Sequence, residues 1–188
     1  MALENGKDLN KVKKILVLYN MIPNLIWSIL NLLPISIFCF MLLSHKVLYI
    51  FLAVSFIPLF LRNSFLDKLQ LGKTTWVYKK LGVHVVNRFA QNGVLINRLI
   101  KKKFPEYKSV TNKRSSISRL INQTYLFEKF HLLFFVFFNL VIAYAVVKGL
   151  LIWACIILLN NIVYNIYPNL LQQYIRLKLK LFNAQSTI

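Results

Sequence analysis

Residues 127–147 read FEKFHLLFFVFFNLVIAYAVV, and this stretch decides the fold. After His131 only one side chain, Asn139, is strongly polar, and the apolar run approaches the length of about 20 residues that a membrane-spanning helix needs. At its start Glu128 and His131 stand three residues apart, which places both on one face of a helix. An ionisable group at membrane depth is costly, so it is a functional candidate by default. The simpler alternative is that Glu128 pairs with a nearby cation and anchors the helix end.

The composition of the whole chain agrees with a membrane protein. Of 188 residues, 57% are hydrophobic, which is too apolar for an ordinary soluble domain. The net charge is +19, but Lys and Arg gather in the connection and tails around the apolar runs, as they do in cytoplasmic loops of membrane proteins. No zinc or RNA-binding motif accompanies these cations, so nucleic acid is not an expected partner. Anionic lipid headgroups are the expected partners of this charge.

Four apolar segments organise the chain as a single membrane domain. In chain order the divisions are residues 15–43 and 47–61 (first helical hairpin), 62–124 (basic connection), 127–147 and 150–167 (second hairpin) and 168–188 (basic amphipathic tail). Interior prolines predict a kinked first helix, and Pro168 predicts an interruption or kink after the fourth segment. We therefore predict an all-helical integral membrane protein with about four transmembrane helices.

The basic connection has the pattern of interfacial helices. Apolar and basic residues alternate over residues 73–91 and 93–103, which predicts two amphipathic helices on the membrane face, with Gly82 and Gly93 as punctuation. Both termini and the connection are rich in Lys and Arg, whereas the two short turns carry one lysine each. The positive-inside rule therefore predicts that the termini and the connection are cytoplasmic.

Polar residues recur at helical spacing within three of the apolar segments, and each row of such residues along one helix face forms a polar seam. Polar side chains in hydrocarbon must face each other or a water-filled cavity. The three seams therefore predict a polar cleft near the cytoplasmic interface, although each Asn taken singly is also compatible with packing between helices. The members are Asn20, Asn24, Ser28 and Asn31; Glu128, His131 and Asn139; and Asn161, Asn165, Asn169, Gln172 and Arg176.

His131 and Glu128 together predict general-base chemistry. An imidazole can take the proton of a substrate hydroxyl, and a carboxylate partner can hold its tautomer and stabilise the imidazolium. Asn and Gln amides or Arg176 can hold a developing oxyanion or a phosphate. No serine or cysteine is evidently paired with His131, so direct transfer is expected rather than an acyl-enzyme. One His and one Glu make a poor metal site, so no metal or other resident cofactor is expected.

Two motifs together resemble a known family. Glu128-x-x-His131 precedes residues 165–179, NIYPNLLQQYIRLKL, and the combination resembles the glycosyl-diaponeurosporenoate acyltransferases, small membrane enzymes that finish staphyloxanthin-type carotenoids. The family tail reads approximately Asn, a nearby Pro, then Gln-Arg-Tyr-Asn-Arg-x-Arg-Leu. The matching positions are Asn165, Gln172, Tyr174, Arg176 and Leu179. The chain departs at Gln173, where the family has Arg, at Ile175, where it has Asn, and at Lys178, where it has Arg.

The resemblance implies a reaction and a set of roles. The implied function is transfer of a fatty acyl group from a thioester such as acyl-CoA to a hydroxyl of a membrane lipid or of a glycosylated isoprenoid or carotenoid, in a bacterial plasma membrane. His131 would be the general base and Glu128 its orienting partner. Substrate-binding roles would fall to Asn165, Gln172, Tyr174 and Arg176, with Asn161 and Asn139 on the same seams.

The basic residues of the connection and the assembly of the protein carry two further expectations. The basic residues Lys101, Lys102 and Lys103 can hold the interface and attract an anionic donor. The alternative from a different class is a non-catalytic membrane protein that packs with a partner or binds lipid, with the Asn seams serving as packing. A homo-oligomer is compatible with either interpretation.

Overall fold

All regular structure in the described part of the chain is helical. The computed structural model describes residues 6–89, 94–105 and 114–185. Its elements in chain order are α1 (Gly6–Leu42), α2 (His45–Ser55), η1 (Ile57–Phe60), α3 (Asn63–Lys68), α4 (Thr75–Lys80), α5 (Val83–Phe89), α6 (Val94–Lys103), α7 (Arg114–Val147), α8 (Leu151–Asn161), η2 (Ile162–Ile166) and α9 (Tyr167–Gln185).

Three helical segments are long and apolar enough to cross a membrane. They are Lys14–Leu42, Ile117–Val147 and Leu151–Ala184, and His45–Phe60 is a shorter apolar segment. The predicted class, an all-helical membrane protein, is confirmed. The second apolar segment is short because it breaks into α2 and the 3-10 turn η1, where Pro58 lies near the start of that turn.

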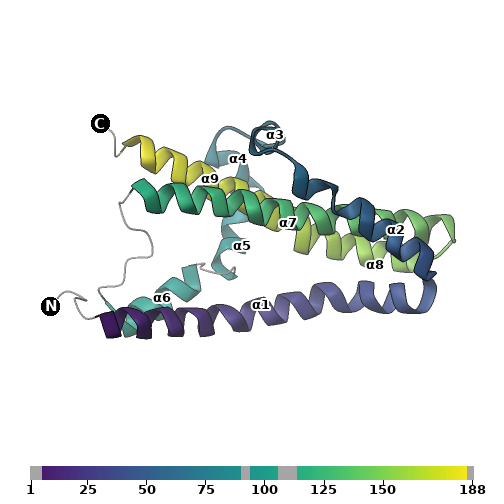
Figure 1. Ribbon diagram of the computed structural model, residues 1–188, viewed down its shortest axis with the longest axis horizontal. Coiled ribbons are helices and arrows are strands. Elements are labelled where there is room, and N and C mark those ends of the chain that lie inside the picture. The colour runs from purple at the N-terminus through teal and green to yellow at the C-terminus, as the bar shows by residue number, and fades with distance from the viewer. Residues whose placement is uncertain (1–5, 90–93, 106–113, 186–188) are drawn as a thin grey trace.

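An antiparallel hairpin of α7 with α8, η2 and α9 forms the centre of the molecule (Figure 1). Gly149 closes it with a positive φ of 72°, a conformation that costs glycine little. The Gly149 amide donates to the Val146 carbonyl at 2.9 Å, and the Leu150 amide donates to the Ala145 carbonyl at 2.8 Å. This pair of bonds is a Schellman motif, which satisfies the last carbonyls of α7 and turns the chain back.

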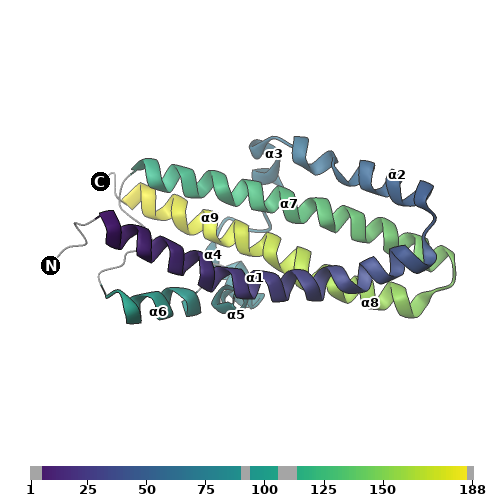
Figure 2. The same ribbon diagram turned by 60° about the horizontal axis from the view of Figure 1, so that its bottom comes forward.

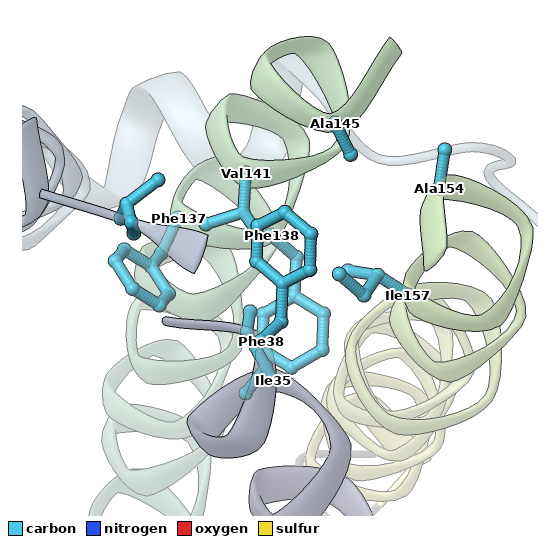
Figure 3. Close-up of a cluster of buried hydrophobic side chains, with 9 residues drawn as sticks. Ile35, Phe38, Phe137, Phe138, Val141, Ala145, Ala154 and Ile157 are labelled. Carbon is cyan, nitrogen blue, oxygen red and sulfur yellow. The ribbon is translucent and has the colours of Figure 1, made fainter. Parts of the chain in front are cut away.

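A cluster of buried apolar side chains joins α1, α7 and α8 near this turn (Figure 3). Phe38 and Phe138 have no exposed surface, and the Phe38 ring meets Trp153 edge to face with centroids 5.7 Å apart. Lipid tails are as apolar as these side chains, so close packing rather than a hydrophobic driving force fixes the helices here. The cluster consists of Ile35, Phe38, Leu43, Phe137, Phe138, Val141, Ala145, Ala154 and Ile157.

Helix α1 is one continuous helix through Pro23 and Pro34 and curves gently (Figure 2). The predicted proline kink is thus a curve, because membrane helices tolerate proline where neighbouring groups or local adjustments satisfy the freed carbonyl. The helix packs against α8 at one end and against α6 at the other, whereas α2 packs along α7.

The polar seam predicted for the first apolar segment does not form. Asn24 and Ser28 are exposed, and the side chain of Asn20 lies outside the described residues. Of the seam members whose side chains the structure describes, Asn31 reaches the hairpin, where its backbone carbonyl accepts the Asn160 side-chain amide at 3.4 Å. The reason is tertiary: α1 meets α8 rather than α9, so much of its length has no polar helix opposite it.

The basic connection is divided more finely than its periodicity predicts. Gly82, with a φ of 73°, separates α4 from α5 within the predicted helix 73–91, whereas α6 matches the predicted helix 93–103 closely. The connection also ends earlier than predicted, because α7 begins at Arg114. Helices α4 and α5 pack against α9, so this part of the connection is attached to the hairpin.

Helix α9 continues α8 through Pro168, with one wide turn between them. Proline has no amide hydrogen, and its ring clashes with the carbonyl four residues earlier in a regular helix. The segment η2 is a single π-helical stretch in which the Tyr167 amide donates to the Ile162 carbonyl, and such a bulge relieves the clash. Residues 168–185, most of the segment predicted as a basic amphipathic tail, therefore continue the fourth helix as α9.

Candidate functional site

The polar residues of the hairpin lie at two depths. Counting the roughly 20 residues of a membrane span back from Val147 reaches Glu128, and counting the same length forward from Leu151 ends shortly before Gln173. This count places Glu128, Gln173 and Arg176 at the end of a 20-residue span that lies far from the Gly149 turn, where a membrane interface is expected. It places the asparagines of α8 and η2 within the span.

Glu128 is a buried hydrogen-bond acceptor between α7 and α9. Its side chain is 1% exposed. Gln173 donates from Nε2 to Oε1 at 2.7 Å, and Arg176 donates from Nη1 to Oε2 at 2.5 Å. The structure thus brings Glu128 to α9 rather than to His131, because a guanidinium forms a stronger, charge-assisted bond than a neutral imidazole.

Arg176 is enclosed between two carboxylates. It has no exposed surface, and its Nε lies 3.4 Å from Oδ1 of Asp67 in α3. The Tyr125 ring stacks 4.2 Å from the guanidinium carbon, and the Tyr125 hydroxyl donates to Asp67 at 2.8 Å. Lys180 lies 3.2 Å from the same Asp67 oxygen. We call this group the interface cluster; its members are Asp67, Tyr125, Glu128, Gln173, Arg176 and Lys180.

The charges of the interface cluster balance. Two carboxylates, Asp67 and Glu128, face two cations, Arg176 and Lys180. Burying an ion costs several kcal/mol unless it is paired and hydrogen-bonded, so this balance allows Glu128 and Arg176 to be buried together. Nη2 of Arg176 has no hydrogen-bond partner among the described residues.

Gln173 connects the cluster to the basic connection. Its Oε1 accepts the Tyr78 hydroxyl of α4 at 3.0 Å and the Leu71 amide at 3.1 Å. Tyr78 is fully buried, and burial raises the pKa of its phenol, so the hydroxyl stays protonated and donates. Tyr174 is also buried, with its ring centroid 6.2 Å from that of Tyr78, whereas the neighbouring Gln172 is only half-buried.

A second polar group, the asparagine seam, lies deeper in the hairpin. Asn161 and Asn165 are 1% and 0% exposed, and the Asn165 side-chain amide donates to Oδ1 of Asn161 at 2.9 Å. Asn161 in turn donates to the Phe135 carbonyl of α7 at 3.4 Å. Asn139 lies outside this seam: it is exposed and donates to the same carbonyl of its own helix at 2.7 Å.

His131 adjoins the asparagine seam, not the interface cluster. Its ring lies beside the backbone carbonyl of Tyr164 and the side chain of Asn165. Nδ1 of His131 is buried, as are Oδ1 of Asn165 and Oδ1 of Asn169, and none of the three has a hydrogen-bond partner in the described part of the chain. The seam therefore holds two unpartnered amide oxygens, and a group that brings O–H donors would satisfy them.

Four residues in or next to the interface cluster were not predicted as site residues from the sequence. Asp67, Tyr78, Tyr125 and Gln173 all contact it, and Tyr125 bonds Asp67 across 58 positions of sequence. Helical spacing carries no information about such contacts. The scarcity of acids was the available signal, since Asp67 is one of only five in the chain.

Within the described residues no three His, Cys, Asp or Glu side chains gather in a metal-binding group. The arrangement defines a helical membrane protein with a charge-balanced interface cluster above a seam that contains one imidazole. The chain belongs to the glycosyl-4,4'-diaponeurosporenoate acyltransferase family, whose sequence profile matches residues 62–185. The predicted resemblance is confirmed, and the match includes every helix that contributes to the cluster. No curated protein and no solved structure matches the chain.

Proposed function

We propose that this chain transfers a fatty acyl group from a thioester to a hydroxyl of a membrane-resident lipid or glycosylated isoprenoid, with His131 as the general base. The supporting observation is the buried, unpartnered Nδ1 of His131 in a member of an acyltransferase family. A substrate hydroxyl that donates to Nδ1 would lose its proton there as its oxygen attacks the acyl carbon. The unpartnered Oδ1 atoms of Asn165 and Asn169 would accept further hydroxyls of a sugar.

Glu128 and Arg176 take a different role in this proposal. Both are buried and paired with each other, so neither has a free charge to offer a substrate. We assign them to holding α7 and α9 together, which sets the position of His131 relative to the seam. Tyr174 packs against Tyr78 of α4, where a donor headgroup outside the hydrocarbon would approach, and Gln172 is half-buried on another face of α9.

The donor side of the proposal rests on charge. Lys101, Lys102 and Lys103 are exposed in the last turn of α6, and Lys79 and Lys80 are exposed at the end of α4. Cations at the interface attract anionic headgroups and the phosphates of an acyl-CoA at about 1 kcal/mol each. With this surface in the cytoplasm, as the positive-inside rule favours, a soluble acyl donor would reach the interface directly.

Mass spectrometry of lipids and pigments from cells that make the wild type or His131→Ala tests the proposal. The host must supply a glycosylated carotenoid acid as the acceptor. We expect a product heavier by one acyl chain with the wild type and at least a 100-fold loss with His131→Ala, since general-base catalysis contributes about 10²–10⁴-fold. The matched control is His84→Ala, because His84 is exposed and distant from the seam in sequence. Full product with His131→Ala would remove the mechanism and favour the packing or lipid-binding alternative.

A further inference from the structure

An open groove lies between η1 and α3, where the second apolar segment ends and the basic connection begins. Its volume is about 390 Å³. Two of its aromatic residues, Phe60 and Phe65, are 85% and 46% exposed, and its two cations, Arg62 and Lys68, are exposed as well. The lining residues are Phe60, Leu61, Arg62, Ser64, Phe65 and Lys68. Aromatic surface beside two cations suits a ligand that has an apolar chain and an anionic end.

The two cations of the groove have no ion-pair partner among the described residues. The carboxylates whose side chains the structure describes, Asp67 and Glu128, pair with cations of the interface cluster instead. Asp67 also belongs to α3, but its carboxylate contacts the hairpin, whereas Lys68, one position along the helix, lines the groove. The groove therefore carries positive charge that the described part of the protein does not neutralise.

The groove lies at the depth expected for a lipid headgroup. The segment His45–Phe60 begins beside the Gly149 turn, where its first residues pack against the buried cluster of α7 and α8 (Figure 1). At about 1.5 Å per residue this segment rises about 24 Å, which is most of the roughly 30 Å hydrocarbon thickness. Arg62 and Lys68 follow directly after it, so they reach the opposite interface, where lipid phosphates lie.

We propose that this groove binds one anionic phospholipid, with its phosphate between Arg62 and Lys68 and the first part of an acyl chain against Phe60 and Phe65. A phosphodiester accepts charge-assisted hydrogen bonds from both a guanidinium and an ammonium. An acyl-CoA fits less well, because its headgroup adds a nucleotide and several more phosphates to a groove with two cations. The lipid would hold α3 from the outside, while Asp67 holds it to the hairpin. This assignment is independent of the proposed acyl transfer.

Native mass spectrometry of the purified protein in detergent counts the lipids that each chain retains. Phosphatidylglycerol is the anionic probe, and phosphatidylcholine with the same acyl chains is the zwitterionic probe. We expect the wild type to retain one phosphatidylglycerol in preference to phosphatidylcholine. Arg62→Gln with Lys68→Gln should weaken this binding about 30-fold, since each of two cations near an anionic headgroup contributes about fivefold. The matched control, Lys73→Gln with Arg119→Gln, removes one exposed lysine and one exposed arginine from outside the groove and should leave the binding largely unchanged.

Ser64→Trp separates binding in the groove from general attraction between charges. This variant keeps both cations and fills the groove, so it should also lose the retained phosphatidylglycerol. Unchanged binding in folded Ser64→Trp protein, equal losses in the groove and control variants, or equal retention of the two lipids by the wild type would each overturn the proposal. Displacement of the lipid by palmitoyl-CoA at a concentration below that of the phosphatidylglycerol would make the acyl donor the occupant and overturn the assignment to phospholipid.

Discussion

Replacing Arg176 with Met should destabilise the protein more than any other single charge removal in the interface cluster. The substitution keeps most of the side-chain volume and leaves the Glu128 carboxylate, 1% exposed, with Gln173 as its one remaining donor in the cluster. Removing one partner of a buried ion pair costs about 3–5 kcal/mol, because the other charge stays buried without compensation. Asp67 adds little to this cost, since it is 38% exposed and keeps Lys180.

The measurement is the free energy of unfolding in mixed micelles titrated with a denaturing detergent, with refolding checked for reversibility. Lys180→Met is the matched control: it removes a 44% exposed partner of Asp67 and should cost about 0.2–1 kcal/mol. Adding Glu128→Gln to Arg176→Met should recover much of the loss, because the uncompensated charge is then gone. Equal losses in Arg176→Met and Lys180→Met, or no recovery in the double variant, would show that Glu128 is not desolvated as described.

Three further predictions follow from the same contacts. Gln173→Arg, the residue that the resemblance implies at this position, removes the nearer of two acceptors of the buried Tyr78 hydroxyl, the other being the Gly72 carbonyl at 3.3 Å, and should cost about 1–3 kcal/mol in the same unfolding assay, with smaller loss when Tyr78→Phe is present. Burial raises the pKa of Tyr78 from its ordinary value of 10.0, so the stability that the protonated phenol contributes is present below pH 10 and is lost as the pH rises through the folded-state pKa. The difference in unfolding free energy between wild type and Tyr78→Phe should therefore change above about pH 10. A difference that stays constant would contradict this prediction. Asn161→Leu should lower acyl product in the mass-spectrometry assay, because it removes a member of the asparagine seam, whereas Asn139→Leu should not, since Asn139 faces outward.

Sequence patterns located the helices of the hairpin and many of its polar residues. Apolar run length predicted α7, and four-residue spacing predicted that Asn161, Asn165 and Asn169 would share a buried face. The spacing failed at the next position. It favoured Gln172, whereas the structure buries Gln173 against Glu128; spacings of three and four residues both keep side chains on one helix face, so the contact with α7 decides between the two.

The partner of Glu128 was beyond the reach of sequence alone. Local spacing predicted His131, three residues away on the same helix, whereas the structure pairs Glu128 with Gln173 and Arg176. Helix α9 brings Arg176 to the same carboxylate across 48 positions, and a charged donor outcompetes a neutral one for a buried anion. Asp67 joins the cluster because α3 folds back onto the hairpin, which no periodicity encodes.

The sequence by itself determined the class of the molecule: the apolar runs must be helical to satisfy their backbone in lipid, and the cations must remain at the interface. It also determined the family, through residues 62–185. Only the tertiary structure decided which polar groups meet. Hydrocarbon forces buried charges and amides to find partners, yet the partners come from whichever helices pack together, and here α9 supplied Arg176 to Glu128 while α4 supplied Tyr78 to Gln173.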